Sequence, residues 1–64
     1  MIIINGEPAA AEGATVFDYL CQNGYDPKRV AVEKNGEILP KPAFDSTILS
    51  DGDVVEVVSF VGGG

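Results

Sequence analysis

The residues of this 64-residue chain best suited to chemistry are its last three, Gly62, Gly63 and Gly64. They directly follow a strand-like apolar run at residues 53–61. Glycine has no side chain to pack and loses much freedom on folding, so such a run adds nothing to a core. Three residues extend at most about 10 Å, which favours a thin tail that enters a narrow channel of another protein. We therefore expect the carboxylate of Gly64 to be the reactive group. The alternative is a frayed terminus, although such ends are usually mixed and polar.

Few other side chains could take part in chemistry. The chain has no histidine and one cysteine, which excludes a zinc site of the usual Cys/His type, an internal disulfide and a Ser/His/Asp or Cys/His nucleophile. Cys21 falls at helical spacing with Val16, Phe17 and Leu20, so we predict that it is a small core residue. These features predict no catalytic residue and no metal site in the chain itself.

Charge narrows the range of partners. Ten acidic and four basic residues give a net charge of −6. This argues against nucleic acid and anionic membranes, which need clustered Lys and Arg, and favours partners with a basic docking surface. The alternative is that acidity only keeps a small protein soluble. The longest apolar stretch is too short to cross a bilayer and no signal-peptide pattern is present, so we expect a cytoplasmic location.

The first half of the chain predicts a hairpin followed by a helix. An apolar strand at residues 1–4 leads into an Asn-Gly turn, and residues 7–12 form a weaker strand that Pro8 restricts to a sheet edge. Thr15 can cap a helix over about residues 15–23, and Gly24 is placed to end it in the left-handed conformation.

The second half predicts a second hairpin and a long closing strand. Strands at residues 30–34 and 37–39 flank another Asn-Gly turn. The prolines at positions 40 and 42 predict an irregular connection, in which Phe44, Ile48 and Leu49 cover one end of the core. The last strand runs over residues 54–61.

This order of elements predicts one fold. The domain, residues 1–61, is expected to be an α+β protein of the β-grasp, or ubiquitin-like, type, and residues 62–64 a flexible tail. In this fold, one main helix packs across a mixed sheet whose first and last strands are parallel neighbours. The most apolar strands suit those central positions.

Alternation in the last strand predicts an apolar patch beside the tail. Val55 and Val57 fall on one face and Val58 and Phe60 on the other. If the helix covers the first face, Val58, Phe60 and the neighbouring Val61 are candidates for docking a partner. The alternative is that a loop covers them.

Several segments of the chain together form a known pattern. They are the opening apolar strand with its turn, the start of the helix, the middle hairpin and the closing strand with its glycines, at Asn5-Gly6, Thr15-Val16, residues 30–40 and residues 51–64. In these segments the chain resembles the ThiS family of sulfur carriers, and the resemblance covers nearly its whole length. Gly62 is one glycine more than the minimal Gly-Gly ending.

The resemblance implies a protein co-substrate in thiamin biosynthesis. An E1-like adenylyltransferase uses ATP to adenylate Gly64, while Gly62 and Gly63 enter its active site. Sulfur from a cysteine desulfurase relay then gives a thiocarboxylate, which supplies a thiazole synthase. No cofactor is bound. The alternatives are a carrier for molybdopterin, cysteine or tungsten-cofactor pathways, or a ubiquitin-like modifier that joins Gly64 to a lysine.

Overall fold

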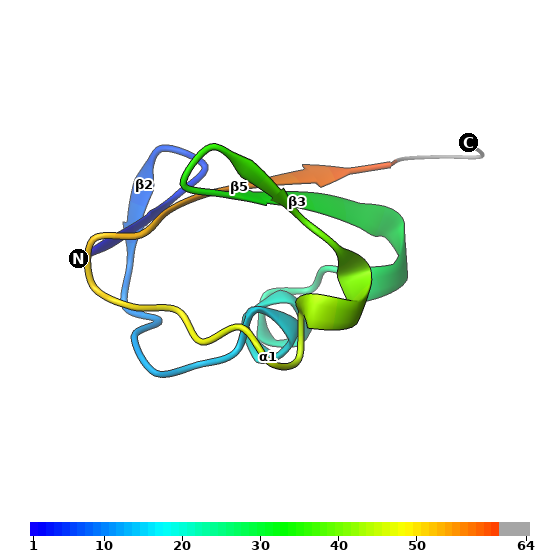
Figure 1. Cartoon of the computed structure of the whole chain (residues 1–64), viewed down its shortest axis with the longest axis horizontal. Helices are drawn as coiled ribbons and strands as arrows, with labels where there is room; N and C mark the ends of the chain where they lie inside the picture. The colour runs from blue at the N-terminus through cyan, green and yellow to red at the C-terminus, as the bar shows by residue number, and fades with distance from the viewer. Residues whose placement is uncertain (61–64) are drawn as a thin grey trace.

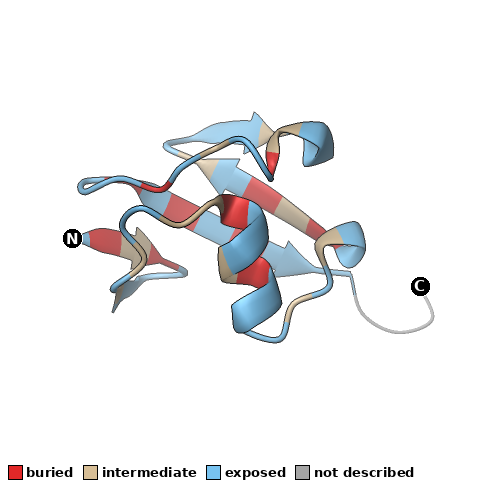
Figure 2. Cartoon of the chain, turned by 90° about the horizontal axis from the view of Figure 1, so that it is seen from below, coloured by how far each residue is buried: buried red, intermediate tan, exposed pale blue. Residues whose placement is uncertain are grey.

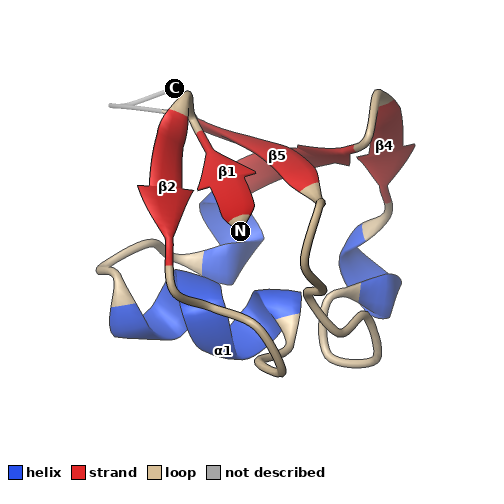
Figure 3. Ribbon diagram, turned by 90° about the vertical axis from the view of Figure 1, so that its left-hand side faces the viewer, coloured by secondary structure: helices blue, strands red, loops and turns tan. Residues whose placement is uncertain are grey.

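The structure is a computed structural model, and it describes residues 1–60. A five-stranded mixed sheet forms one layer, and helix α1 with two short 3-10 helices lies on one side of it (Figure 1, Figure 3). No helix in this part of the chain is long and apolar enough to cross a membrane. The elements are β1 Ile2–Ile4, β2 Glu7–Ala9, α1 Val16–Gln22, η1 Pro27–Arg29, β3 Val30–Lys34, β4 Glu37–Leu39, η2 Lys41–Ala43 and β5 Val54–Ser59.

The strands follow the order β2-β1-β5-β3-β4, which places β5 at the centre of the sheet. β1 and β5 are parallel, with Ile3 opposite Val54 and Ile4 opposite Val55, and β3 pairs antiparallel with β5. Figure 3 shows β1 between β2 and β5. The predicted β-grasp fold, its parallel neighbours and the edge position of Pro8 are therefore confirmed.

Both Asn-Gly turns bind β5 as well as closing their own hairpins. Asn5 and Asn35 have positive φ values of 52° and 54°, as a type I′ turn requires. The Oδ1 of Asn5 accepts the N–H of Val57 at 2.8 Å, and the Oδ1 of Asn35 accepts the N–H of Val54 at 2.9 Å. Two local turn signals thus also fix the central strand.

Helix α1 begins and ends as the sequence predicts. The Thr15 hydroxyl accepts the N–H of Asp18 at 3.0 Å. Gly24 follows the helix with a φ of 82°, and the next N–H, of Tyr25, donates to the carbonyl of Leu20 at 2.9 Å. This is the Schellman pattern, which glycine permits because it has no Cβ.

The core lies between the sheet and α1, as the burial colours of Figure 2 show. Phe17 and Ile48, predicted to be core residues, are 42 % and 54 % exposed, so that prediction is wrong for both. With seven residues, α1 contacts the sheet mainly through a narrow stripe that leaves Phe17 to one side. The buried apolar residues are Ile2, Ile4, Val16, Leu20, Val30, Val32, Phe44, Leu49, Val55 and Val57.

Three details differ from the prediction. The connection predicted to be irregular contains the 3-10 helix η2, Lys41–Ala43, which includes Pro42. Proline is tolerated in the first turn, because its missing N–H has no partner within the helix there. Strand β2 ends at Ala9, before the predicted Glu12, and β5 ends at Ser59. Val61, predicted to lie in β5, is outside the described residues.

Candidate functional site

The predicted reactive tail, Gly62, Gly63 and Gly64, lies outside the described residues, as does the docking candidate Val61. The structure does show what precedes it. The chain leads into the tail from β5, the central strand, and the N–H of Phe60 donates to the carbonyl of Arg29 at 2.9 Å. β5 is paired with β1 at its start and with β3 along its length. The tail therefore follows a strand that is held on both sides at its start.

The sheet face away from α1 carries exposed apolar side chains near the end of β5, where the chain leads into the tail. Val58 and Phe60 are 55 % and 58 % exposed, while Val55 and Val57 are buried under the helix layer. The predicted alternation along β5 is thus confirmed, although docking stays a prediction. Lys41 lies over Phe60, with its Nζ 6.0 Å from the ring centroid. We call the sheet face away from α1, which carries Val58 and Phe60, the open face.

Two carboxylates also lie on the open face. Glu33 of β3 stands directly opposite Glu56 of β5, and both side chains are exposed. Like charges directly opposite each other destabilise a sheet. Together with the net charge of −6, this pair makes the open face complementary to a basic, partly apolar surface. Sequence reasoning missed the pair because it depends on the register between two strands.

Asp53 immediately precedes β5 and is a buried carboxylate, 8 % exposed. Its Oδ2 accepts the N–H of Ser50 at 2.9 Å, its Oδ1 accepts the Asn35 amide at 3.1 Å, and the Lys34 Nζ lies 3.7 Å away. The Ser50 hydrogen bond, followed by the Asn35 hydrogen bond and the Lys34 charge, lowers the pKa of Asp53 against the opposing effect of burial. These contacts make Asp53 a structural group that fixes the turn before β5.

Replacing Asp53 is expected to destabilise the protein in a pH-dependent way. Because the pKa is lower in the folded state, the carboxylate contributes fully above its ordinary value of about 3.9 and loses that contribution as pH falls below it. We expect Asp53→Ala to cost about 1–3 kcal/mol at neutral pH, since it leaves the Ser50 N–H and the Asn35 amide unpaired. Urea unfolding at several pH values measures this. If the parent and the variant lost equal stability on acidification below about pH 4, this account of Asp53 would be wrong.

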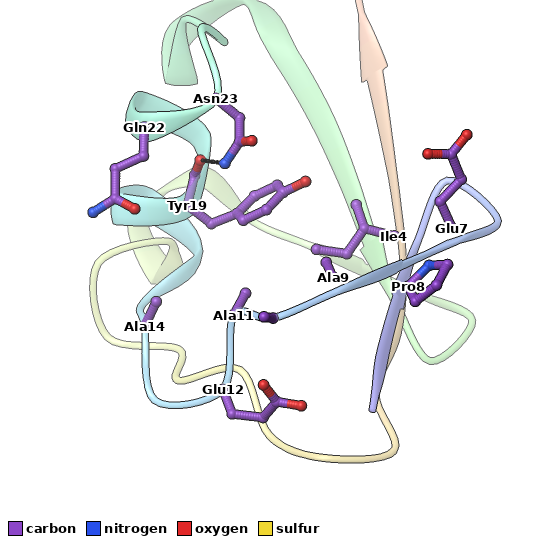
Figure 4. Close-up of a pocket in the computed structure, with 11 residues that line it drawn as sticks. Ile4, Glu7, Pro8, Ala9, Ala11, Glu12, Ala14, Tyr19, Gln22 and Asn23 are labelled. Atoms are coloured by element: carbon purple, nitrogen blue, oxygen red, sulfur yellow. Dashed lines mark hydrogen bonds between the residues drawn. The ribbon is translucent and has the colours of Figure 1, made fainter.

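A hollow of about 450 Å³ lies between the β1–β2 hairpin and α1 (Figure 4). Tyr19 points from the helix toward Ile4, and the Asn23 amide donates to the Tyr19 carbonyl at 2.8 Å. Burial raises the pKa of Tyr19, helped by Tyr25 and the charge of Glu7, so its phenol stays protonated. Within residues 1–60, no group of three His, Cys, Asp or Glu side chains could hold a metal ion.

Comparison with known proteins decides the family. The model of the ThiS family matches residues 2–64. The chain belongs to the ThiS family. A sulfur carrier protein ThiS of Thermus thermophilus is 42 % identical over 64 residues, with 100 % of both chains covered. The crystal structure of a thiamine biosynthesis protein (ThiS) from Geobacter metallireducens has a TM-score of 0.78 and 40 % identity, covering 98 % of this chain and 97 % of that one.

The ThiS sequence pattern also occurs within a longer protein. A thiazole synthase of Paramagnetospirillum magneticum is 42 % identical over 64 residues, covering 98 % of this chain. The chain spans only 20 % of the length of that relative. A segment similar to a ThiS-family protein is therefore part of a chain named for thiazole synthesis.

Cys21 of this ThiS-family chain is exposed, so the prediction of a core residue is wrong. The buried stripe of α1 passes through Val16 and Leu20, and the residue after Leu20 is rotated about 100° away from the sheet. Helical spacing alone overestimated the width of the buried face.

Because Cys21 is exposed, we expect Cys21→Ser to change the free energy of unfolding by less than about 0.5 kcal/mol. Sulfur loading of the tail should also be unchanged, since the thiol is not the proposed acceptor. Denaturant unfolding and intact mass after loading measure the two effects. A folded variant that no longer accepts sulfur would show that the Cys21 thiol takes part in the transfer.

Proposed function

We propose that the protein is a sulfur carrier of thiamin biosynthesis that works as a co-substrate rather than a catalyst. The observation that carries the proposal is the similarity, over the full length of both chains, to a protein named sulfur carrier ThiS. The family match through residue 64 includes the three glycines. In this proposal, the carboxylate of Gly64 is the group that changes.

The chemistry follows from the weakness of a carboxylate as an acyl donor. An E1-like adenylyltransferase, here the activating enzyme, joins the Gly64 carboxylate to the AMP part of ATP and releases pyrophosphate. A persulfide sulfur supplied by the cysteine desulfurase then attacks the acyl carbon and AMP leaves. A thiol reductant cleaves the resulting acyl disulfide, which gives the thiocarboxylate. The acyl-adenylate hydrolyses in open water, so the enzyme must enclose it. A narrow enclosure accepts residues without side chains, which accounts for Gly63 and Gly64.

The partners in the proposal are the activating enzyme, a cysteine desulfurase that supplies sulfur, and a thiazole synthase that consumes it, all in the cytoplasm. The choice of thiazole synthase as a partner is supported by a relative with that name, which contains a segment similar to this chain. A β-grasp fold alone also suits carriers for molybdopterin, cysteine or tungsten-cofactor pathways and ubiquitin-like modifiers. The full-length similarity to a ThiS carrier favours thiamin biosynthesis over these.

Intact mass spectrometry tests this function directly. The protein is incubated with ATP, the activating enzyme, a cysteine desulfurase, cysteine and a thiol reductant. We expect a mass increase equal to the replacement of one oxygen by sulfur, which disappears when ATP is omitted. An unchanged mass, or conjugates joined through lysine with no sulfur gained, would contradict the proposal.

A further inference from the structure

One side of β5 continues beyond the strand that pairs with it. β1 ends at Ile4, opposite Val55, whereas β5 runs on to Ser59. Asn5 extends the pairing by two further bonds: its N–H donates to the Val55 carbonyl at 2.9 Å, and its side chain accepts the Val57 N–H at 2.8 Å. Among residues 1–60, the hydrogen bonds on the β1 side of β5 stop at this point.

Alternation along the strand then determines where the remaining backbone groups point. The N–H groups of alternate residues point to the same side of a strand, so the Ser59 N–H points to the β1 side, like that of Val57. The Phe60 N–H points to the other side, where it donates to Arg29. Within residues 1–60, the Ser59 N–H and C=O and the Val57 C=O therefore have no hydrogen-bond partner. We call these three groups the β5 edge.

The β5 edge lacks the protection of the outer edge of the sheet. Strand β2 carries Pro8, which has no N–H to offer a further strand. The β5 edge carries no proline, Ser59 is exposed, and its neighbours Val58 and Phe60 expose apolar side chains on the open face. An unprotected edge of this kind can accept an extended segment as an added strand.

We propose that the β5 edge pairs with an extended segment of the activating enzyme while the tail occupies its active site. This rests on the proposed function, in which that enzyme receives Gly64. An added strand fixes the direction in which the chain leaves the sheet, and so aligns the carboxylate for reaction. The position supports this occupant, because the edge lies a few residues before the tail, next to the open face.

Charge argues for a partner protein over a second copy of this chain. Edge-to-edge pairing of two copies would bring together two chains with a net charge of −6 each, and each carries the Glu33–Glu56 pair on the neighbouring face. A segment bearing Lys or Arg meets attraction at the same place. The enzyme segment is therefore expected to be basic.

The first test removes the donor of the β5 edge. Ser59→Pro deletes the Ser59 N–H, which the described fold does not use, and Ser59→Ala is the matched control that keeps this N–H and loses only the hydroxyl. We expect Ser59→Pro to lower kcat/KM for ATP–pyrophosphate exchange about tenfold, the effect of one lost hydrogen bond, with Ser59→Ala close to the parent. Equal rates for both variants, with both folded, would overturn the proposal.

Amide hydrogen exchange on the parent protein tests the pairing without a substitution. In the free protein, the Ser59 amide should exchange fast, while those of Val57 and Phe60, which are hydrogen-bonded, are protected. A saturating amount of activating enzyme should slow exchange at Ser59 about tenfold or more. Fast exchange in the complex would overturn the proposal even if pyrophosphate exchange upholds the carrier function.

Two other results would also be decisive. Protection of the Ser59 amide in the protein alone, growing with concentration, would show that a second copy occupies the edge. Absence of pyrophosphate exchange with the parent protein would overturn the carrier function and this inference together.

Discussion

Deleting Gly64, or replacing Gly63 with leucine, is expected to abolish adenylation while leaving the melting temperature almost unchanged. The stability half of this expectation follows from the core, whose last buried apolar residue among those described is Val57. A change several residues beyond Val57 removes no buried surface from the described fold. The folded state should therefore hardly register it.

The activity half follows from the chemistry of the tail. The activating enzyme must close around the reacting carboxylate to exclude water, so the fit of the channel should depend steeply on side-chain volume. Moving the carboxylate back by one residue displaces it about 3.5 Å from the phosphate it must meet, which is too far for reaction. We expect a loss of at least about a thousandfold in pyrophosphate exchange for both variants.

The measurement pairs a thermal melt with ATP–pyrophosphate exchange on the same samples. Gly62→Ala is the matched control, since it adds one methyl group farther from the reacting carboxylate and should retain most of the parent rate. A Gly63→Leu variant that is folded and exchanges pyrophosphate at the parent rate would show that the glycine terminus is not the reactive end.

Much of the fold could be predicted because its signals are local. Each Asn-Gly pair predicts a hairpin turn without reference to the rest of the chain. Thr15 and Gly24 mark the ends of α1 within a few residues. Alternation in β5 correctly separated Val57 from Val58, because the period of a strand is two and one face is covered. These features need no knowledge of which strands are neighbours.

The errors arose where the fold as a whole decides burial. Cys21 and Phe17 have the spacing of core residues, but a helix of seven residues on a small sheet buries only one stripe. In the connection before β5, Ile48 points outward while the adjacent Leu49 is 1 % exposed. The exposure of these residues does not follow from composition, because it depends on which elements of the fold lie opposite each of them.

The candidate site was predictable in part for the same reason. The open face could be predicted from one strand alone, whereas the glycine tail lies outside the described residues and stays a prediction. The Glu33–Glu56 pair and the β5 edge could not be predicted from one strand, because both depend on register across the sheet. The bond from Val57 to Asn5 joins residues far apart in sequence. Among residues 1–60, Ser59 has the next amide on that side of β5, and it has no partner there.

The open face gives the second large effect. We expect Val58→Arg to raise the KM for the activating enzyme strongly, lowering kcat/KM for pyrophosphate exchange about 10–100-fold. Val58 is 55 % exposed in the free protein, so the substitution should shift the melting temperature little. At a docked interface, the arginine both removes buried apolar contact, worth about 1.5–3 kcal/mol for a valine, and places a positive charge against the basic surface that we expect on the enzyme.

The matched control is Ile38→Arg, which introduces the same charge on the same face. Ile38 lies in β4 at the far side of the sheet, is 68 % exposed, and stands opposite Glu33. If contact beside the tail is what matters, Ile38→Arg should stay within about threefold of the parent, because a charge at the rim of an interface has a small effect. Equal losses for the two variants would mean that the charge of the whole open face governs docking, and equal parental rates would show that the enzyme binds elsewhere.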